Sequence, residues 1–363
     1  MARHRHQSSV ESVLEFSPPF PLAPHQKNKA QILLHNFIRH YGLEQIVQKG
    51  YKPAKLIQAT HDRVACQDTF LRFFFLFIYV KPSDLKESNV DADFSAALSY
   101  VESFIEDPTN VKAAIEDFAE YIMDNFLLPL RASSAKTPQA TPRSLSSIQT
   151  PTPNGTRQRV SVLRQSCLVR DRHRCVVSRK FDLVEARKRT EQHGGNSEDD
   201  EGNLLMNESR GGFQYLEIAH ILPHCLTTIA PGEPELSESK RNVLRILDMF
   251  DPGLSHRLDG PKIDSPANAI TLTLDLHRLF GEFQIFFERT GRPHDRTIDP
   301  PDYRLLGVHC AIAHIMKLSG AGEYIEEIQC DMDEVDVKTD GSTNLGYMME
   351  LRLNGWLNSL AVF

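Results

Sequence analysis

Apolar residues recur at intervals of three and four along the first third of the chain, a spacing typical of amphipathic helices. The first such series ends at a glycine, Gly42, and consists of Ile32, Leu33, Phe37, Ile38 and Tyr41. Further series cover residues 94–105, just before an Asp-Pro pair, and residues 111–128. The apolar run 73–80 is far shorter than the roughly 20 residues that cross a bilayer, and it predicts a buried helix or strand. We therefore expect a helical domain at residues 29–130, to which the pattern assigns no role and no protein partner.

Two segments lack this periodicity. Residues 1–28 are rich in proline, serine and histidine, and residues 131–156 are rich in serine, threonine and proline with almost no large apolar side chains. Such segments cannot bury enough apolar surface to offset the conformational entropy lost on folding. The composition thus predicts a disordered N-terminus, a flexible linker and a domain boundary near residue 157.

Beyond the linker the pattern changes to short strands. Residues 215–223 alternate well enough for a strand that ends in a loop at Pro223. Residues 264–272 predict a short β segment that leads into a helical turn, and residues 281–288 alternate again and predict a closing strand. Residues 321–363 follow as a C-terminal extension. The expected fold class is α+β, with a helical N-terminal domain, a flexible linker and a C-terminal domain at residues 157–320.

The charge of the chain is uneven. Its 41 Lys and Arg against 48 Asp and Glu give a net charge of −7, so bulk charge does not indicate a nucleic-acid-binding protein. Residues 157–189, however, contain eleven basic against three acidic residues, a local excess of 11 − 3 = +8. This basic segment would attract phosphates, or it is a solvated surface with ordinary ion pairs. Residues 191–212, which are acidic and rich in Gly and Asn, are expected to form a mobile insertion.

The cysteines and the N-terminus exclude several classes of protein. Six cysteines are spread over the chain without a CxxC pair, which argues against a zinc ribbon and against a disulfide-dense secreted fold. The N-terminus has no apolar region of the length that a secretory signal needs. We expect an intracellular protein, nuclear or cytoplasmic, that has no membrane association.

Four short motifs in the C-terminal domain occur in a recognisable order. They are RDRHRCVVS at residues 170–178, EIAHILP at 217–223, NAITL at 268–272 and DLHRLFG at 275–281, and His277 follows Asn268 by nine residues. With these motifs the chain resembles the HNH, or His-Me finger, endonucleases, and in particular a subgroup with an Ala-His-Ile first box that is found in fungal proteins. The resemblance implies an HNH-type ββα-metal nuclease domain with added strands and helices, in which residues 170–178 form an opening strand.

The resemblance also implies a reaction. Such a domain would hydrolyse phosphodiester bonds of nucleic acid, in the first place DNA, with one divalent cation, Mg²⁺ or Mn²⁺ ahead of Zn²⁺. His220 would be the general base, because neutral imidazole has a suitable pKa. Asn268 would hold the loop that carries this base through hydrogen bonds to the backbone, and His277 would ligate the cation.

One position departs from the family pattern. Many HNH enzymes have Asp or His directly before the base, as a second metal ligand, whereas this chain has Ala219. Another carboxylate could take over that role, with Glu217, Asp264 and Asp275 nearest in sequence, or one imidazole, waters and substrate phosphate could hold the cation. If neither applies, catalysis is lost and the domain is an inactive nucleic-acid-binding or protein-interaction module.

Other readings of these residues stay open at this point. Each of the three motif residues, taken singly, is compatible with a structural role. A structural zinc is a further alternative, and its ligands would be His220, His224, Cys225 and His277. Phosphate contacts or plain surface charges are expected at Arg172, Arg174 and Arg278.

Overall fold

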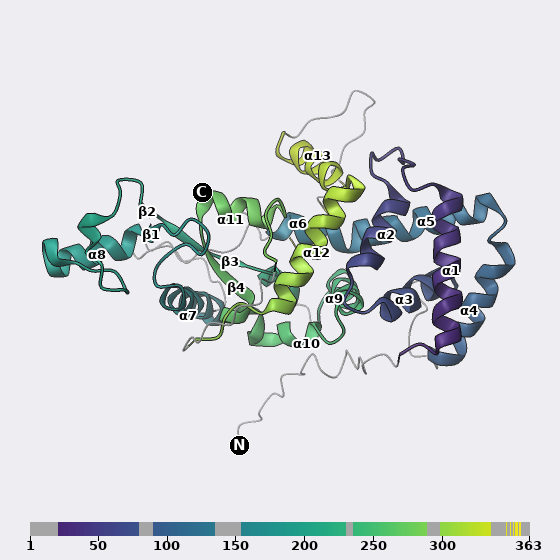
Figure 1. The fold of residues 1–363 in the computed structure, drawn as a ribbon, viewed down its shortest axis with the longest axis horizontal. Helices are drawn as coiled ribbons and strands as arrows, with labels where there is room; N and C mark the ends of the chain where they lie inside the picture. The colour runs from purple at the N-terminus through teal and green to yellow at the C-terminus, as the bar shows by residue number, and fades with distance from the viewer. Residues whose placement is uncertain are drawn as a thin grey trace, which may run out of the picture. The chain divides into compact units, whose positions relative to one another are not determined.

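The computed structural model describes residues 21–79, 90–134, 154–229, 235–288 and 298–334, together with a few positions between 346 and 356 (Figure 1). Its contacts divide the chain into two compact units. The first, called the helical unit here, comprises Met1–Ala132, Leu226–Gly260 and Cys310–Phe363. The second, called the hairpin unit, comprises Ser133–Cys225 and Pro261–His309. Helices dominate and the strands are few and short, so the predicted α+β class is confirmed.

The helical unit is built from amphipathic helices whose ends follow local sequence signals. Gly42 has a φ of 95° and ends the first helix, while the Asp107 side chain accepts a hydrogen bond from the Thr109 amide at the start of a later one. The helices are α1 (Pro24–Tyr41), α2 (Pro53–Arg63), α3 (Gln67–Tyr79), α4 (Val90–Phe104), α5 (Pro108–Ile122), a π-helical turn (Met123–Leu127), α6 (Leu128–Ser134), α9 (Glu238–Phe250), α10 (Ser255–Leu258) and α13 (Ala321–Glu334).

Aromatic side chains fill the core of this unit. The Phe118 ring packs edge-on against Phe74, with centroids 4.9 Å apart, and against Phe70 at 6.1 Å. All three rings are fully buried. The apolar run predicted as a buried helix or strand is therefore helical over residues 73–79, and Val80 lies outside the described residues.

The ends of the predicted disordered segments are helical. Helix α1 already begins at Pro24, and α6 extends to Ser134. Helix α7 (Asn154–Arg170) begins before the predicted boundary at residue 157. These three helical ends lie inside the segments predicted to be disordered, whereas residues 1–20 and 135–153 lie outside the described part of the chain.

The hairpin unit contains the predicted strand–loop–strand–helix order. Strand β3 (Leu216–His220) pairs antiparallel with β4 (Ala269–Thr273), and α11 (Leu274–Gly281) follows β4 directly (Figure 1). The register places Glu217 opposite Leu272 and His220 opposite Ala269. A second, parallel pair joins β1 (Phe181–Asp182) to β2 (Phe213–Gln214), and α8 (Leu183–His193) follows β1.

Two predicted strands are absent from the described hairpin unit. Residues 170–178 form the end of α7 and a turn, in which Arg172 and His173 have φ values of 56° and 52° that a strand does not allow. Residues 281–288 form turns rather than a closing strand, and Phe283 has a φ of 58°. Alternating apolar residues were misleading here, because Phe283 packs on the ring of His309 instead of joining a sheet.

His309 lies on α12 (Tyr303–Ser319) and is fully buried among aromatic rings of the hairpin unit. Its ring stacks on Phe280 with centroids 3.9 Å apart, and its Nε2–H donates to the Phe280 carbonyl oxygen at 3.0 Å. Burial lowers the pKa of His309 to about 3, although the hydrogen bond to the carbonyl opposes this shift. The imidazole is therefore neutral at neutral pH.

Acidification is expected to destabilise the hairpin unit through this histidine. The folded-state pKa of about 3 lies below the ordinary value of 6.5, so the unfolded chain binds more protons between these two values. The free energy of unfolding should therefore fall as the pH decreases from 6.5, with about 2 kcal/mol lost from this group by about pH 5. In thermal melts, a His309→Phe variant should lose less stability than wild type on acidification, and equal losses would contradict the assignment.

None of the described helices is, by itself, long and apolar enough to cross a membrane, although α12 and α13 taken together, with a bend of 88° between them, meet the length and composition of a span.

Candidate functional site

The site forms where β3 ends and β4 begins. Because the two strands are antiparallel, the loop after His220 and the loop before Ala269 leave the same end of the hairpin. The first loop continues into a short 3₁₀ turn, His224–Thr227, and the second contains the 3₁₀ turns Gly260–Asp264 and Pro266–Asn268. Side chains that are about 40 residues apart in sequence therefore meet at this end.

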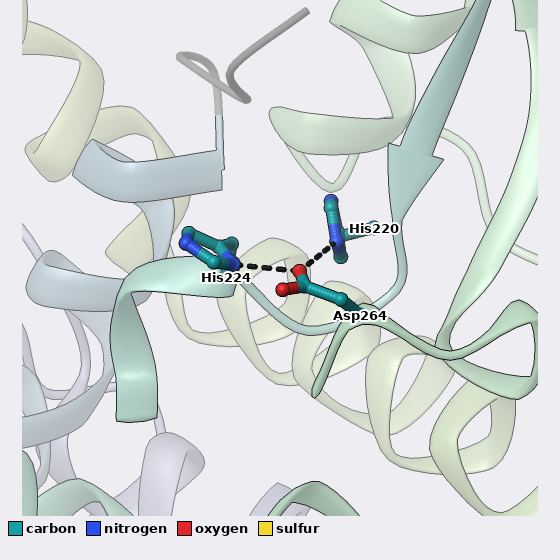
Figure 2. A group of neighbouring side chains, drawn as sticks. All are labelled: His220, His224 and Asp264. Carbon is teal, nitrogen blue, oxygen red and sulfur yellow. Dashed lines mark hydrogen bonds and ion pairs between the residues drawn. The ribbon is translucent and has the colours of Figure 1, made fainter. Parts of the chain in front are cut away.

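Two histidines share one carboxylate oxygen in this position. Asp264 Oδ1 lies 2.7 Å from His224 Nδ1 and 3.2 Å from His220 Nε2 (Figure 2). The other oxygen, Oδ2, accepts a hydrogen bond from Arg159 Nε on α7 at 3.1 Å. The side chains of His220 and Asp264 are 2 % and 1 % exposed. We refer to His220, His224 and Asp264 as the His–Asp–His cluster.

Burial sets the protonation of His220. Desolvation lowers its pKa and outweighs the hydrogen bond to Asp264, which acts in the opposite direction. For Asp264, burial raises the pKa, but the hydrogen bonds from His220 and His224 outweigh it, so the net shift is downward. A neutral His220 beside a carboxylate carries its proton on Nε2. Its Nδ1 is then an unprotonated nitrogen, and it is buried without a hydrogen-bond partner among the described residues.

Asn268 joins the two loops of the site. Its side chain is fully buried; Oδ1 accepts from the Leu222 amide at 3.0 Å, while Nδ2 donates to the carbonyl oxygens of Leu222 and Ile263 at 3.0 and 2.9 Å. Leu222 lies two residues after His220, and Ile263 lies directly before Asp264. The Asn268 amide therefore fixes the loop after His220 relative to the turn that carries Asp264.

His277 projects from α11 and is paired with a carboxylate from β3. Its Nδ1 lies 2.7 Å from Glu217 Oε2, and the imidazole is buried. Glu217 precedes Ala219 by two residues and so lies on the same face of the strand. The charge of His277 also contributes to the lowered pKa of His220, so the two imidazoles are electrostatically coupled.

The structure brings the predicted residues together in two groups. Asp264 joins His220, and Glu217 joins His277, whereas Asp275 is exposed in the first turn of α11. Among the described residues, the group of possible metal ligands whose atoms lie within 4.8 Å of one another is the His–Asp–His cluster. The alternative zinc set is therefore assembled only in part, with Asp264 in place of Cys225 and His277.

The sequence did not point to Arg159. The basic segment predicted only a charged patch, and residues 170–178 were expected to be a strand. A usable signal was present, since Val160, Leu163 and Cys167 have the spacing of a helix face. Helix α7 follows that spacing and delivers Arg159 to Asp264 across 105 residues of sequence.

Three arginines of the basic segment, Arg172, Arg174 and Arg189, form ion pairs with the acidic insertion at residues 191–212. Arg174 contacts Asp199 at 2.8 Å and also Glu208, and Arg172 contacts Glu201. The insertion is thus built into the hairpin unit through ion pairs. Arg174 is largely buried by these contacts, which favours the reading of ordinary ion pairs at that position.

Arg278 is placed differently. It follows His277 on α11, its side chain is 78 % exposed, and its Nε contacts Glu282 at 2.8 Å. Exposed guanidinium groups of this kind can still present their remaining N–H donors to a phosphate.

One comparison with known proteins, the comparison with family models, gives a match in the segment that carries this site. The comparisons with curated proteins and with solved structures give no match. A family model described as HNH endonuclease matches residues 175–288, a range that contains β3, β4, α11 and the three motif residues His220, Asn268 and His277. The segment that carries the hairpin and its helix is therefore similar to HNH endonucleases.

Proposed function

We propose that the hairpin unit is a divalent-cation-dependent endonuclease that hydrolyses phosphodiester bonds of nucleic acid, with DNA as the first substrate to test. The family match supports nuclease-type chemistry. The observation that carries the proposal is the buried, unpartnered Nδ1 of His220, at the end of a hairpin that Asn268 braces.

His220 is the proposed general base. Asp264 accepts the Nε2–H of His220 and leaves the Nδ1 lone pair to take a proton from the attacking water. The lowered pKa keeps the imidazole neutral near neutral pH, which is the form that can accept a proton. Asn268 is a positioning residue, because its three hydrogen bonds go to the backbone of the loops that carry His220 and Asp264.

The cation site is proposed at His277. A hydrogen bond from Nδ1–H to Glu217 fixes the tautomer that leaves Nε2 with a lone pair, an arrangement common among metal-ligating histidines. This donor chemistry fits a cation that keeps waters and a substrate phosphate as its other ligands, as Mg²⁺ and Mn²⁺ do. When bound, the cation would stabilise negative charge on the scissile phosphate. Glu217 lies on the same strand face as Ala219, the position at which many HNH enzymes have Asp or His, and we propose that it supplies the carboxylate there.

Arg278 and Arg172 are proposed phosphate contacts. Their side chains are the exposed members of the predicted set, at 78 % and 58 %, whereas Arg174 is held by two carboxylates. A guanidinium presents its N–H donors in a planar fork that matches the geometry of a phosphate. Binding through such contacts would weaken with salt.

Ala219 favours a second candidate function, a module of the same fold that binds nucleic acid or protein without turnover. The two functions are separated by cleavage of supercoiled plasmid DNA, with single-stranded DNA and RNA as further substrates, with and without chelator. Cleavage that requires Mg²⁺ or Mn²⁺ supports the enzyme, whereas binding without cleavage of any of these substrates supports the module.

Replacing His277 with alanine should weaken Mg²⁺-dependent cleavage strongly and leave partial activity at high Mn²⁺, because waters replace an imidazole ligand poorly. Plasmid nicking rates over a metal titration would measure this. A matched control is His193→Ala, which removes an exposed histidine at the end of α8. Unchanged metal dependence in the His277 variant would contradict its role as a ligand.

A further inference from the structure

His224 has no part in the reaction proposed above, although it lies in the centre of the site. Its Nδ1 is 2.7 Å from Asp264 Oδ1, the same oxygen that contacts His220 Nε2 (Figure 2). The three ligand atoms lie within 4.8 Å of one another, and all three residues are buried. Two imidazoles that converge on one carboxylate oxygen have the composition of a metal site.

The donor set selects the class of cation. Two imidazole nitrogens and one carboxylate oxygen suit Zn²⁺ and related transition metals, whereas Mg²⁺ prefers oxygen ligands and retains several waters. The His–Asp–His cluster is therefore matched to a different cation from the one proposed at His277. The hairpin unit therefore contains a second candidate metal site, whose ligands differ from those proposed around His277.

The distances require little rearrangement. Zinc ligands that lie about 2.0 to 2.2 Å from the ion are roughly 3.3 to 3.5 Å apart in a tetrahedral site. The atom separations of 2.7 and 3.2 Å in the cluster are slightly shorter, so the ligands need to open only by several tenths of an ångström. Arg159 occupies Oδ2 of Asp264 and leaves Oδ1 for the ion. Its side chain is 45 % exposed, so solvent screens its repulsion of a cation.

We propose that His220 Nε2, His224 Nδ1 and Asp264 Oδ1 bind a divalent transition-metal cation of the Zn²⁺ class, and that this cation switches off the nuclease. The first part of this proposal, metal binding, depends only on the geometry of the cluster. The second part, inhibition of cleavage, rests on the proposed function. A neutral imidazole has one lone-pair nitrogen. When the cation takes the lone pair of Nε2, the single ring proton resides on Nδ1, so His220 can no longer accept a proton from water.

Metal binding to the full chain tests the first half. Isothermal titration with Zn²⁺ and visible absorption of Co²⁺ should show one site in wild type, and Zn²⁺ should raise the melting temperature. The variant His224→Asn keeps a hydrogen-bond donor near the position of Nδ1 but is a poor ligand, so its affinity should fall by roughly 10²-fold. Asp264→Asn is a second variant, His193→Asn is the matched control at an exposed histidine, and circular dichroism checks that each folds.

Two results would overturn the site. One is wild-type Zn²⁺ affinity in a folded His224→Asn protein. The other is loss of that affinity in His277→Ala with His224→Asn unaffected, which would place the ion on α11 instead.

Plasmid cleavage in saturating Mg²⁺ tests the second half. Added Zn²⁺ should inhibit wild type, and His224→Asn should need a much higher Zn²⁺ concentration for the same inhibition. Zn²⁺ that binds through the cluster without slowing cleavage would overturn the switch. If the wild-type protein cleaves nothing, the proposed function and the switch fail together, while the titrations still decide whether the cluster is a metal site.

Discussion

Replacing His220 with alanine is expected to lower the rate of phosphodiester cleavage by about 10²- to 10⁴-fold at saturating Mg²⁺ or Mn²⁺, the loss typical of a missing general base. The affinity for the activating cation should change little, because His277 and Glu217 are untouched. The cleavage rate falls because the variant removes the unpartnered Nδ1 of a neutral, buried imidazole, which is the proposed proton acceptor. Single-turnover cleavage of plasmid DNA over a metal titration separates the two effects.

A structural role for His220 would give a different result. The imidazole is buried beside Asp264, so its removal also costs stability, and the comparison must be made at equal folded fraction. Melting temperatures of wild type, His220→Ala and the surface control His193→Ala provide that correction. Equal cleavage rates for folded wild type and folded His220→Ala would refute the assignment of the base.

Replacing Arg170 with methionine is expected to lower the free energy of unfolding of the hairpin unit by about 3 to 5 kcal/mol, the range for breaking a buried ion pair from one side. Arg170 donates to both oxygens of Asp171 at 3.0 and 2.7 Å, and to the carbonyl oxygens of Pro266 and Ala269 at 2.6 and 2.9 Å. The guanidinium and the carboxylate are almost completely buried. The variant removes the counter-charge of a buried carboxylate and one donor from each of two carbonyls, of which the Pro266 carbonyl keeps the Ala269 amide as a donor.

A double variant provides the control for this effect. Replacing Asp171 with leucine in the Arg170→Met background removes the buried carboxylate that has lost its counter-charge, so much of the lost stability should return. Chemical denaturation of the single and double variants would measure it. A double variant as unstable as Arg170→Met alone would show that the cost comes from the lost hydrogen bonds to the carbonyls on either side of Asn268 and not from the lost ion pair.

The parts of the fold that could be predicted from the sequence are those set by local signals. The end of α1 at Gly42 and the start of α5 after Asp107 depend on the conformational preferences of single residues, so they are readable from the chain. The identity of β3, β4 and α11 as two strands and a helix likewise follows from the local pattern of each segment. The motifs that resemble HNH endonucleases pointed to His220, Asn268 and His277 as site residues, and their roles stay predictions.

The predicted strand at residues 281–288 shows where such reasoning stops. Alternating apolar residues satisfy a strand, but they also suit a turn whose side chains enter a core from one side. The stacking of Phe280 and Phe283 on His309, which comes from another helix, decides between the two. The consecutive domain boundaries drawn from composition remain a prediction, and the contacts divide the chain in an interleaved way.

The sequence by itself determined the motif order, the helical first third and the similarity of residues 175–288 to HNH endonucleases. It left open which carboxylate replaces a ligand at Ala219, because Glu217, Asp264 and Asp275 are equivalent by proximity in sequence. Only the tertiary structure separated them, placing Glu217 on His277, Asp264 between two histidines and Asp275 at the surface. The reason is physical: partners 40 to 60 residues apart meet only after the antiparallel pairing of β3 and β4 has set the register, and no local periodicity encodes that.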